Sequence, residues 1–278
     1  MKIKEQENDI ILENIECFDV ELSLFCGQAF RWEKNEDGSF TGTVRGKVLN
    51  ISQNGSSVIL KNTTKEDFQN IWLDYFDLER DYADICKRFE DDIYLKKARD
   101  EYYGIRVLNQ EPWEALCSFI ISQNNNIPRI KNTIEKLCEG YGTKIDEYYA
   151  FPSYEQLSLI PIDFFKSIGC GYRAEYLVNA IKNLKDFNYK QINDISTDDA
   201  RAILMKIKGI GRKVADCILL FGFYKTDVFP TDTWITKVYE DEFGENNLSA
   251  VKISEYYSKK FGNLAGFAQQ YMFYAKRK

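Results

Sequence analysis

The first third of the chain alternates apolar and polar positions in the manner of β-strands. The stretch FTGTVRGKVLNISQNGSSVIL, residues 40–60, is rich in β-branched residues and predicts strand, turn and strand, with the turn at Asn54-Gly55. From about Thr64 the apolar residues recur at helical spacing instead, as in FQNIWLDYF. We therefore expect an α+β fold: an N-terminal antiparallel β-sheet subdomain with flanking helices, residues 1–95, followed by a mainly α-helical core, residues 96–278.

Glycine, proline and asparagine residues mark the predicted ends of helices in the helical part of the chain. The segment EPWEALCSFIISQ, residues 111–123, predicts a buried helix that stops at Asn124-Asn125-Asn126. Pro128 suits the first turn of the next helix, which runs to a glycine. Further helical segments are ARAILMKIKGIGRKVADCILLFGF, FPTDTWITKVYEDEF and NLAGFAQQYMFYAKRK.

Composition excludes several classes of protein. No apolar run approaches the ~18 to 20 residues that span a bilayer, and MKIKEQENDIILENIE lacks the apolar core of a signal peptide, so we expect a cytoplasmic protein. The chain has no histidine, which removes histidine-based acid–base catalysis and the commonest zinc and iron sites. Seven cysteines occur singly, without a CxxC pair, and indicate buried apolar residues rather than a disulfide framework or a metal site.

Charge is unevenly distributed along the chain. The net charge is −6, yet residues 1–95 carry 11 basic and 20 acidic side chains, whereas residues 96–278 carry 26 basic and 23 acidic ones. Between Arg201 and Tyr239 there are seven basic and three acidic residues. This local excess of positive charge favours binding of a polyanion.

The segment KGIGRKVADC, residues 208–217, predicts a tight turn between two helices. The first helix would end at Gly209-Ile210-Gly211 and the second would begin near Arg212. Glycines permit positive φ and leave N–H groups uncovered at a helix N-terminus, where a DNA phosphate would be favoured. The dinucleotide patterns GxGxxG and GxxxxGK[ST] are both incomplete here. A plain glycine helix cap remains the alternative.

Lys213 would lie in the first turn of the second helix. There the helix dipole and the neighbouring Lys208 and Arg212 disfavour a protonated amine, which is the direction that makes an amine nucleophilic. Cys217 lies four residues on and shares its helix face. By itself, such a lysine is more often an exposed solubilising charge.

Several separated motifs resemble those of one enzyme family. LMKIKGIGRKVADC followed by FPTDTW resembles the helix-hairpin-helix and downstream aspartate of base-excision DNA glycosylases, more narrowly the eukaryotic type of 8-oxoguanine DNA glycosylase. The resemblance extends from CGQAFRW to the last helix. It implies a helix-hairpin-helix glycosylase core with the hairpin at about residues 200–222.

The resemblance implies two catalytic residues. Lys213 matches the nucleophile that attacks C1′ of the damaged nucleotide, expels the base and leaves an imine, after which β-elimination nicks the strand. Asp232 matches the aspartate that steadies positive charge on the sugar and orients the lysine. Its position after Pro230-Thr231 also suits a helix N-cap, and both roles are compatible.

The family pattern also implies a pocket for a base extruded from the duplex. The matching base-binding residues are Gly27, Cys217, Pro230, Gln269 and Phe273. Cys217 and Phe273 would sandwich the purine, Gln269 would read its Watson–Crick edge, and the Gly27 carbonyl would accept N7–H of the lesion. Core packing, or a turn in the case of Gly27, is the local alternative.

Four residues match those that handle the opposite strand. Asn124 would fill the vacated space and Tyr172 would act as a wedge, while Arg129 and Arg173 would donate to the acceptors of the estranged cytosine. Judged locally, they are turn asparagines and surface arginines. Together with Gly209 and Gly211 of the hairpin, they complete the expected DNA-binding residues.

The chain also departs from the family pattern. Trp234 stands where the eukaryotic enzymes have a histidine near the active-site phosphate, and Gln123 stands where a serine is usual. No cysteine follows Cys217, which argues against the iron–sulfur cluster of related glycosylases. We expect no metal and no nucleotide cofactor.

The resulting hypothesis is a bifunctional DNA repair glycosylase and AP lyase that excises 8-oxoguanine opposite cytosine. Its partner would be double-stranded DNA in the nucleoid of a bacterium, bound by a monomer. Two alternatives are a non-catalytic helix-hairpin-helix DNA-binding module and a monofunctional glycosylase for alkylated purines. Borohydride trapping on lesion DNA separates these possibilities, because only a lysine imine is trapped covalently.

Overall fold

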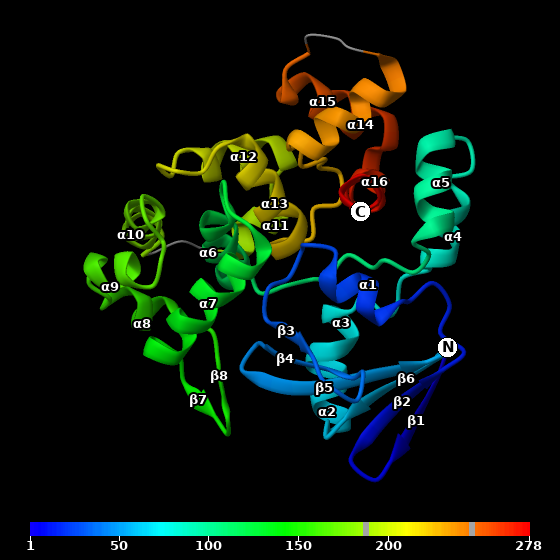
Figure 1. Ribbon diagram of the computed structural model, residues 1–278, viewed down its shortest axis with the longest axis horizontal. Helices are drawn as coiled ribbons and strands as arrows, with labels where there is room; N and C mark the ends of the chain where they lie inside the picture. The colour runs from blue at the N-terminus through cyan, green and yellow to red at the C-terminus, as the bar shows by residue number, and fades with distance from the viewer. Residues whose placement is uncertain (186–188, 245–247) are drawn as a thin grey trace. The chain divides into compact units, whose positions relative to one another are not determined.

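The computed structural model describes residues 1–185, 189–244 and 248–278 (Figure 1). The fold is α+β, as predicted, with an N-terminal sheet followed by helices. The chain forms two compact units, which are described separately below. The first comprises Met1–Thr41, Leu49–Asn109 and Thr226–Lys278, and the second comprises Gly42–Val48 and Gln110–Lys225. A subdomain boundary at residue 95 stays a prediction.

One six-stranded sheet occupies the N-terminal part of the chain, in the order β1-β2-β6-β5-β4-β3. Its strands are β1 (Lys2–Gln6), β2 (Asp9–Glu13), β3 (Trp32–Lys34), β4 (Phe40–Val44), β5 (Lys47–Asn54) and β6 (Ser57–Lys61). The predicted strand, turn and strand over residues 40–60 is in fact three strands. Arg45 and Gly46 have positive φ values of 48° and 75° and form an additional turn. Asn54 pairs with Ser57, so Gly55 lies inside the second turn.

Helices complete the first unit. They are α1 (Val20–Phe25), α2 (Lys65–Asp67), η1 (Phe68–Trp72), α3 (Leu73–Tyr75), α4 (Tyr82–Lys87), α5 (Ile93–Glu101), α14 (Thr233–Phe243), α15 (Ala250–Phe261), η2 (Gly262–Leu264) and α16 (Ala265–Arg277). The core contains two buried tryptophans whose indole N–H groups are satisfied: Trp32 donates to Tyr75 and Trp72 to Thr63, each at 2.8 Å. Helix α16 packs against α5 and α14.

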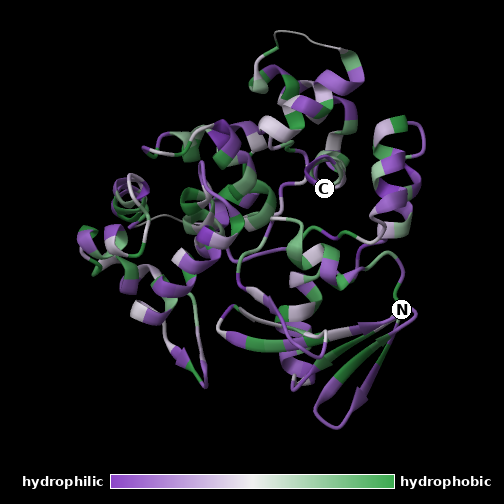
Figure 2. Cartoon of the chain, in the orientation of Figure 1, coloured by the Kyte–Doolittle hydropathy of each residue, from purple (hydrophilic) through white to green (hydrophobic). Residues whose placement is uncertain are grey.

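The second unit is almost entirely helical. Its elements are α6 (Pro112–Ser122), α7 (Ile127–Tyr141), β7 (Lys144–Ile145), β8 (Tyr148–Tyr149), α8 (Tyr154–Ser158), α9 (Ile162–Ser167), α10 (Arg173–Asn183), α11 (Tyr189–Asp194), α12 (Thr197–Met205) and α13 (Arg212–Gly222). Helices α6 and α13 pack together and are strongly hydrophobic (Figure 2). Gly222 permits this approach, because a Cβ there would lie 3.0 Å from that of Ala115.

The predicted helix boundaries follow from capping residues. Thr64 caps the helix that begins at Lys65, and Asn126 caps α7, in which Pro128 occupies the first turn. Helix α7 ends where Gly142 donates its N–H to Cys138 at 2.7 Å. Over the described part of the chain, none of the helices is both long and apolar enough to span a membrane.

Candidate active site

The helix-hairpin-helix predicted from KGIGRKVADC is present in the second unit. Helix α12 ends at Met205, Ile207 and Ile210 are buried beneath the turn, and α13 begins at Arg212. Gly211 is the N-cap of α13 and is exposed, and a Cβ built on it would meet no atom within 4 Å. The N-terminus of α13 is therefore sterically open to an anion.

Gly209 has a different structural role from Gly211. Its φ is +96°, and a Cβ at this position would lie 2.2 Å from the ring of Tyr176 on α10. Both the backbone conformation and the ring contact therefore require glycine. Tyr176 was not singled out in the sequence, because an aromatic residue on an amphipathic helix predicts only packing.

A buried ion pair joins the two helices of the hairpin. Arg201 of α12 donates Nε to Oδ1 of Asp216 on α13 at 2.5 Å, with side-chain exposures of only 9% and 1%. Burial raises the pKa of Asp216, and the Arg201 guanidinium opposes that rise. Arg201 thus has a structural role in joining the two helices, whereas Lys206 and Lys208 are exposed.

Breaking this pair should destabilise the protein. Arg201→Ala leaves the buried Asp216 carboxylate with only the more distant charge of Arg212, whose Nε lies 3.9 Å from Oδ2, and we expect a loss of about 3 kcal/mol in the free energy of unfolding, measured by urea denaturation. Lys206→Ala is the matched control, since it removes an exposed charge from the end of the same helix and should cost no more than about 0.5 kcal/mol. Equal losses in the two variants would contradict a structural role for the pair.

Lys213 occupies the first turn of α13 and is half-buried. Its Nζ lies 5.9 Å from the centroid of the Phe119 ring on α6. Cys217 follows one turn later on α13 and is buried. The predicted nucleophile and the predicted base-stacking thiol therefore lie on one face of one helix.

The loop between α6 and α7 carries the predicted space-filling residue. Asn124 is exposed, has a positive φ of 45°, and donates Nδ2 to the Tyr172 hydroxyl at 3.3 Å. Arg173 is buried and stabilises the loop by donating hydrogen bonds to the carbonyls of Gln123 at 2.6 Å and Asn124 at 2.8 Å. Asn124, Tyr172 and Arg173 thus form one connected group, while Arg129 is exposed on the first turn of α7.

Gln123 connects this loop to the hairpin. Its Nε2 donates to the Gly209 carbonyl at 3.0 Å, a distance that the shorter serine usual in the family would not span. Removing the bond in Gln123→Ala should speed amide hydrogen exchange in the hairpin by roughly 3- to 10-fold. Asn125→Ala is the control, because Asn125 lies in the same loop but bonds the Ile121 carbonyl at the end of α6, so its loss should leave the hairpin unchanged. Unaltered exchange in Gln123→Ala would show that this hydrogen bond does not stabilise the hairpin.

Asp232 lies in the first unit, immediately before α14. Its Oδ1 accepts N–H groups from Trp234 at 2.9 Å and Ile235 at 3.0 Å, which makes it the N-cap predicted from the sequence. The cap uses one carboxylate oxygen, so Oδ2 is not committed to the helix. The Nζ of Lys237 lies 4.8 Å from a ring centroid of Trp234, the residue expected to stand in place of a histidine.

Gly27 and Phe273, distant in sequence, meet in the first unit. Gly27 has a φ of +89°, and a Cβ there would lie 3.3 Å from the Phe273 ring and 3.1 Å from the Arg277 guanidinium. Gln269 lies one turn before Phe273 on α16, is buried, and accepts from Gln270 at 2.9 Å. Three of the five predicted base-binding residues therefore lie on or against α16.

Gln28 supports the loop that carries Gly27, a role that the sequence did not reveal. Its side chain is fully buried and donates to the Ser23 and Arg106 carbonyls at 2.8 and 2.7 Å, while accepting from the Leu108 amide at 2.9 Å. A buried glutamine with such bonds fixes the backbone on both sides of it. Two of its three bonding partners, Arg106 and Leu108, are remote in sequence, so the motif CGQAFRW alone does not show these bonds.

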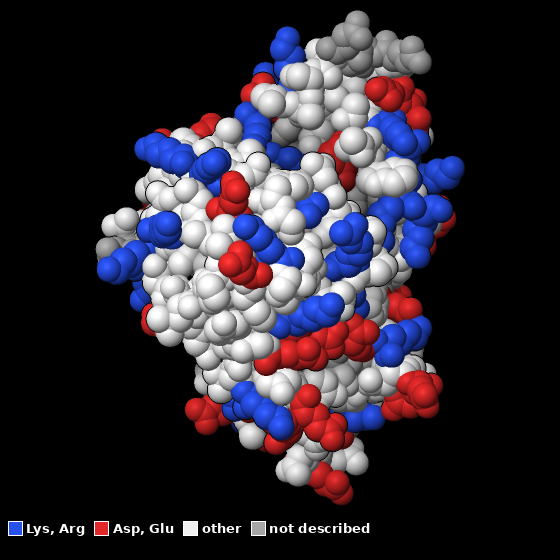
Figure 3. All heavy atoms as spheres, turned by 60° about the vertical axis from the view of Figure 1, so that its left-hand side comes forward, with Lys and Arg blue, Asp and Glu red and all other residues white. Residues whose placement is uncertain are grey.

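The candidate residues are divided between the two units. Lys213, Cys217, the hairpin glycines and the residues for the opposite strand belong to the second unit, whereas Gly27, Pro230, Asp232, Gln269 and Phe273 belong to the first. On the face that Figure 3 shows, lysine and arginine side chains lie among aspartate and glutamate side chains. Among residues 1–185, 189–244 and 248–278, no cluster of three Cys, Asp or Glu side chains could hold a metal ion.

Comparison with known proteins extends over nearly the whole chain. Residues 10–116 match the family described as 8-oxoguanine DNA glycosylase, N-terminal domain. The chain is 30% identical to the N-glycosylase/DNA lyase of Saccharomyces cerevisiae, over 90% of this chain and 81% of that protein. It is also 30% identical to the probable N-glycosylase/DNA lyase of Methanothermobacter thermautotrophicus, over 92% of both chains.

A solved structure from Clostridium acetobutylicum is similar throughout. It is an 8-oxoguanine glycosylase/lyase in complex with double-stranded DNA containing cytosine opposite 8-oxoguanine. The TM-score is 0.96 and the identity 38%, and the match covers 100% of this chain and 98% of the other.

An antiparallel sheet with a helical core, and a helix-hairpin-helix followed by a capping aspartate, define a DNA glycosylase of the helix-hairpin-helix class. Within this class, the similar proteins are N-glycosylase/DNA lyases, and the similar solved structure is an 8-oxoguanine glycosylase/lyase. The chain belongs to the 8-oxoguanine DNA glycosylase/lyase family.

Proposed function

We propose that this protein excises 8-oxoguanine paired with cytosine from duplex DNA and nicks the strand through an imine formed on Lys213. The observation that carries the proposal is the position of Lys213, in the first turn of α13 behind a sterically open glycine N-cap. A DNA phosphate held at the N-cap would bring the deoxyribose next to this amine. Double-stranded DNA with the same base pair is bound in the Clostridium acetobutylicum relative.

The reaction begins with attack of the Lys213 amine on C1′. The new nitrogen–carbon bond forms as the C1′–N9 bond breaks, and the base leaves with the bonding electrons. Loss of a proton from nitrogen and opening of the sugar ring give the imine. Removal of a proton from C2′ then expels the 3′ phosphate, which nicks the strand. The Phe119 ring beside the amine limits the directions in which the side chain extends.

Asp232 stabilises the positive charge that develops on the sugar during base loss. The carboxylate is held by two backbone N–H groups through Oδ1, which fixes its orientation and leaves Oδ2 for the sugar. The two functions inferred from the sequence, helix cap and electrostatic partner, thus use different oxygens. Lys237 and the Trp234 indole N–H are the donors that could contact a phosphate in place of the family histidine.

The lesion is distinguished from guanine by one hydrogen atom. The N7 of 8-oxoguanine carries a hydrogen, which the Gly27 carbonyl would accept, and guanine would leave that carbonyl unpaired at a cost of about 1–3 kcal/mol. The contact of Gly27 with the Phe273 ring supports this arrangement. Gln269 would read the Watson–Crick edge, and Cys217 and Pro230 would flank the base.

The opposite strand would be contacted by the group around Asn124. Asn124 fills the space left by the base, and Tyr172 wedges beside it. Arg173 uses N–H groups for the carbonyls of Gln123, Asn124 and Cys170, which leaves two of its five donors for cytosine. Exposed Arg129 keeps its guanidinium available for the same base.

Arg129→Ala should weaken the preference for cytosine opposite the lesion by roughly 10-fold, because one donor to the estranged base is lost. Excision would be measured on duplexes with each of the four bases opposite 8-oxoguanine. Lys136→Ala removes an exposed charge from the same helix and serves as the control. If Arg129→Ala kept the wild-type order and ratios, Arg129 would have no part in reading cytosine.

Borohydride trapping tests the proposal as a whole. Wild-type protein should form a covalent adduct with a duplex containing 8-oxoguanine opposite cytosine. Base release without an adduct would indicate a monofunctional glycosylase, and binding without either would indicate a non-catalytic DNA-binding module. A bacterial cytoplasm with access to the nucleoid is the location we propose for this activity.

A further inference from the structure

The first unit buries two reduced cysteines in direct contact. Cys17, in the loop before α1, and Cys86, in α4, are each 3% exposed, and their Sγ atoms lie 3.1 Å apart. The Tyr271 hydroxyl of α16 lies 3.5 Å from the sulfur of Cys86 and 3.9 Å from that of Cys17. A disulfide requires a sulfur separation of about 2.05 Å, so closure needs an approach of only about 1 Å.

The backbone at Cys17 is held in an unusual conformation. Its φ is +49°, a left-handed value that costs energy for a residue with a side chain. Arg106 maintains it by donating Nε to the Cys17 carbonyl at 3.0 Å and a terminal nitrogen to the Glu16 carbonyl at 3.1 Å. The guanidinium is itself fixed against the rings of Phe18 and Tyr82, at 5.1 and 4.3 Å from their centroids.

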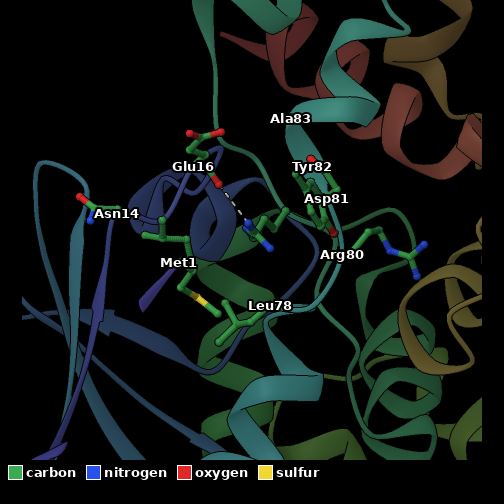
Figure 4. Close-up of a pocket in the computed structure, with 10 residues that line it drawn as sticks. Met1, Asn14, Glu16, Leu78, Arg80, Asp81, Tyr82 and Ala83 are labelled. Atoms are coloured by element: carbon green, nitrogen blue, oxygen red, sulfur yellow. Dashed lines mark hydrogen bonds between the residues drawn. The ribbon is translucent and has the colours of Figure 1, made fainter. Parts of the chain in front are cut away.

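A pocket of about 290 Å³ opens beside this residue (Figure 4). Its lining includes Glu16, the chain neighbour of Cys17, and the supporting Arg106. The hydroxyl of half-exposed Tyr103 also interacts with the Cys17 thiol. A small polar solute can therefore approach as far as Glu16, the chain neighbour of Cys17, while the two thiols are themselves only 3% exposed.

The two thiols differ in acidity. The hydrogen bond from Cys86 lowers the pKa of Cys17 to about 7 against the opposing effect of burial, with further help from Tyr271, Tyr103 and Arg106. The same bond, together with burial, raises the pKa of Cys86. The pair therefore offers one thiolate, the reactive form, beside one thiol that can resolve its oxidation.

Three of the other thiols differ from this pair. Burial raises the pKa of Cys26 and of Cys170 to about 12 and raises that of Cys117 well above the usual value. Thiols held in their protonated form react slowly with oxidants. Reactivity should therefore be concentrated at Cys17.

We propose that Cys17 and Cys86 form a reversible disulfide when the protein meets hydrogen peroxide. The Cys17 thiolate attacks one peroxide oxygen and becomes a sulfenic acid, and hydroxide leaves and takes up a proton to become water. The Cys86 sulfur then attacks the sulfenic sulfur, and its thiol proton and the hydroxyl group leave as a second water. Overall, two thiols are oxidised by two electrons and one peroxide is reduced to two waters.

The disulfide would tie the loop before α1 to α4 and alter the surroundings of Tyr271 on α16. The bond would join the two ends of the chain segment from Cys17 to Cys86 and so reduce the conformational entropy of the unfolded state. The melting temperature should therefore rise by roughly 5 °C or more. Formation of the bond does not depend on the proposed function. Cys17 would thus be a redox-sensitive modification site in the first unit of this protein.

The test treats the folded protein with hydrogen peroxide, then unfolds it so that the buried thiols become accessible, blocks the remaining thiols by alkylation and maps the peptides by mass spectrometry. Of the seven cysteines, we expect two to be lost to alkylation, recovered as a Cys17–Cys86 peptide pair that dithiothreitol reverses. Cys86→Ala should stop the reaction at a sulfenic acid on Cys17, trapped by dimedone, and should form it more slowly because the hydrogen bond that lowers the Cys17 pKa is lost. Cys17→Ser should abolish both products, whereas Cys138→Ala, which removes another buried thiol, should still form the disulfide.

Two results would overturn the proposal. One is peroxide treatment that leaves both thiols alkylatable in wild-type protein that remains folded by circular dichroism. The other is first oxidation at a different cysteine, with Cys17 still reduced. A rise in melting temperature that also occurs in Cys17→Ser would likewise assign the stabilisation to another site.

Discussion

Lys213→Gln should lose both the borohydride-trapped adduct and the release of 8-oxoguanine, the latter by roughly 10³-fold or more. Glutamine has a similar length but its amide nitrogen is not nucleophilic, so the bond to C1′ cannot form. The fold should be retained, because Lys213 is only half-buried and lies in the first turn of α13. The measurement is single-turnover base release on an 8-oxoguanine:cytosine duplex, with trapping in parallel.

Lys208→Gln is the matched control for the charge. Lys208 lies in the same hairpin, is exposed, and loses the same positive charge without touching the reacting carbon. It should weaken binding to duplex DNA modestly and leave the adduct intact. If Lys213→Gln released base as fast as Lys208→Gln, the amine would not be the nucleophile.

Asp232→Asn should lower base release by roughly 10²- to 10³-fold while the fold stays intact. Asparagine caps helices about as well as aspartate, so α14 should keep its N–H bonds from Trp234 and Ile235. Only the negative charge that we propose to lie beside the sugar is lost. Single-turnover kinetics and a melting curve of the same preparation measure the two effects separately.

Asp232→Ala provides the contrast, because it removes the cap as well as the charge. It should show the same kinetic defect as Asp232→Asn and an additional loss of about 1 kcal/mol in stability. Wild-type rates in Asp232→Asn would leave Asp232 as a helix cap alone. Substrate binding without turnover in that variant would instead agree with a charge needed in the transition state.

Helix boundaries were predictable because their signals are local. Thr64 accepts a bond from Asp67, and Asp232 accepts from Trp234, each within three residues. The glycine turn between α12 and α13 is equally local, and its position agrees with the prediction. Such interactions depend on short sequence separation, so the pattern of residue types is sufficient to find them.

Some strands were missed because their local pattern is weak. Every residue of β1 is exposed, so no apolar alternation marks it, and β7 and β8 contain two residues each. Strand β1 is defined by its pairing with β2, from Lys2 opposite Glu13 to Gln6 opposite Asp9. Pairing between strands is a relation between segments, which a pattern within one segment does not carry.

The charged residues of the hairpin also show the difference between a local sequence pattern and a contact made by tertiary packing. In the sequence, Arg201 counts as one of seven basic residues of a region suited to polyanions. In the fold it pairs with buried Asp216, because the packing of α12 on α13 removes both groups from solvent. Burial of an ion pair is a consequence of helix packing and has no signature in charge counts.

By itself, the sequence determined the order of sheet and helices, the glycine hairpin and the chemical types at the candidate site, among them an amine after the hairpin and a carboxylate at a helix start. Only the tertiary structure decided that Gly27 lies against Phe273, that Gln123 bonds the Gly209 carbonyl, and that Cys17 touches Cys86. The physical reason is the range of the interactions. Turns and caps are formed between near neighbours in the chain, whereas these contacts join residues that only the packing of the core brings together.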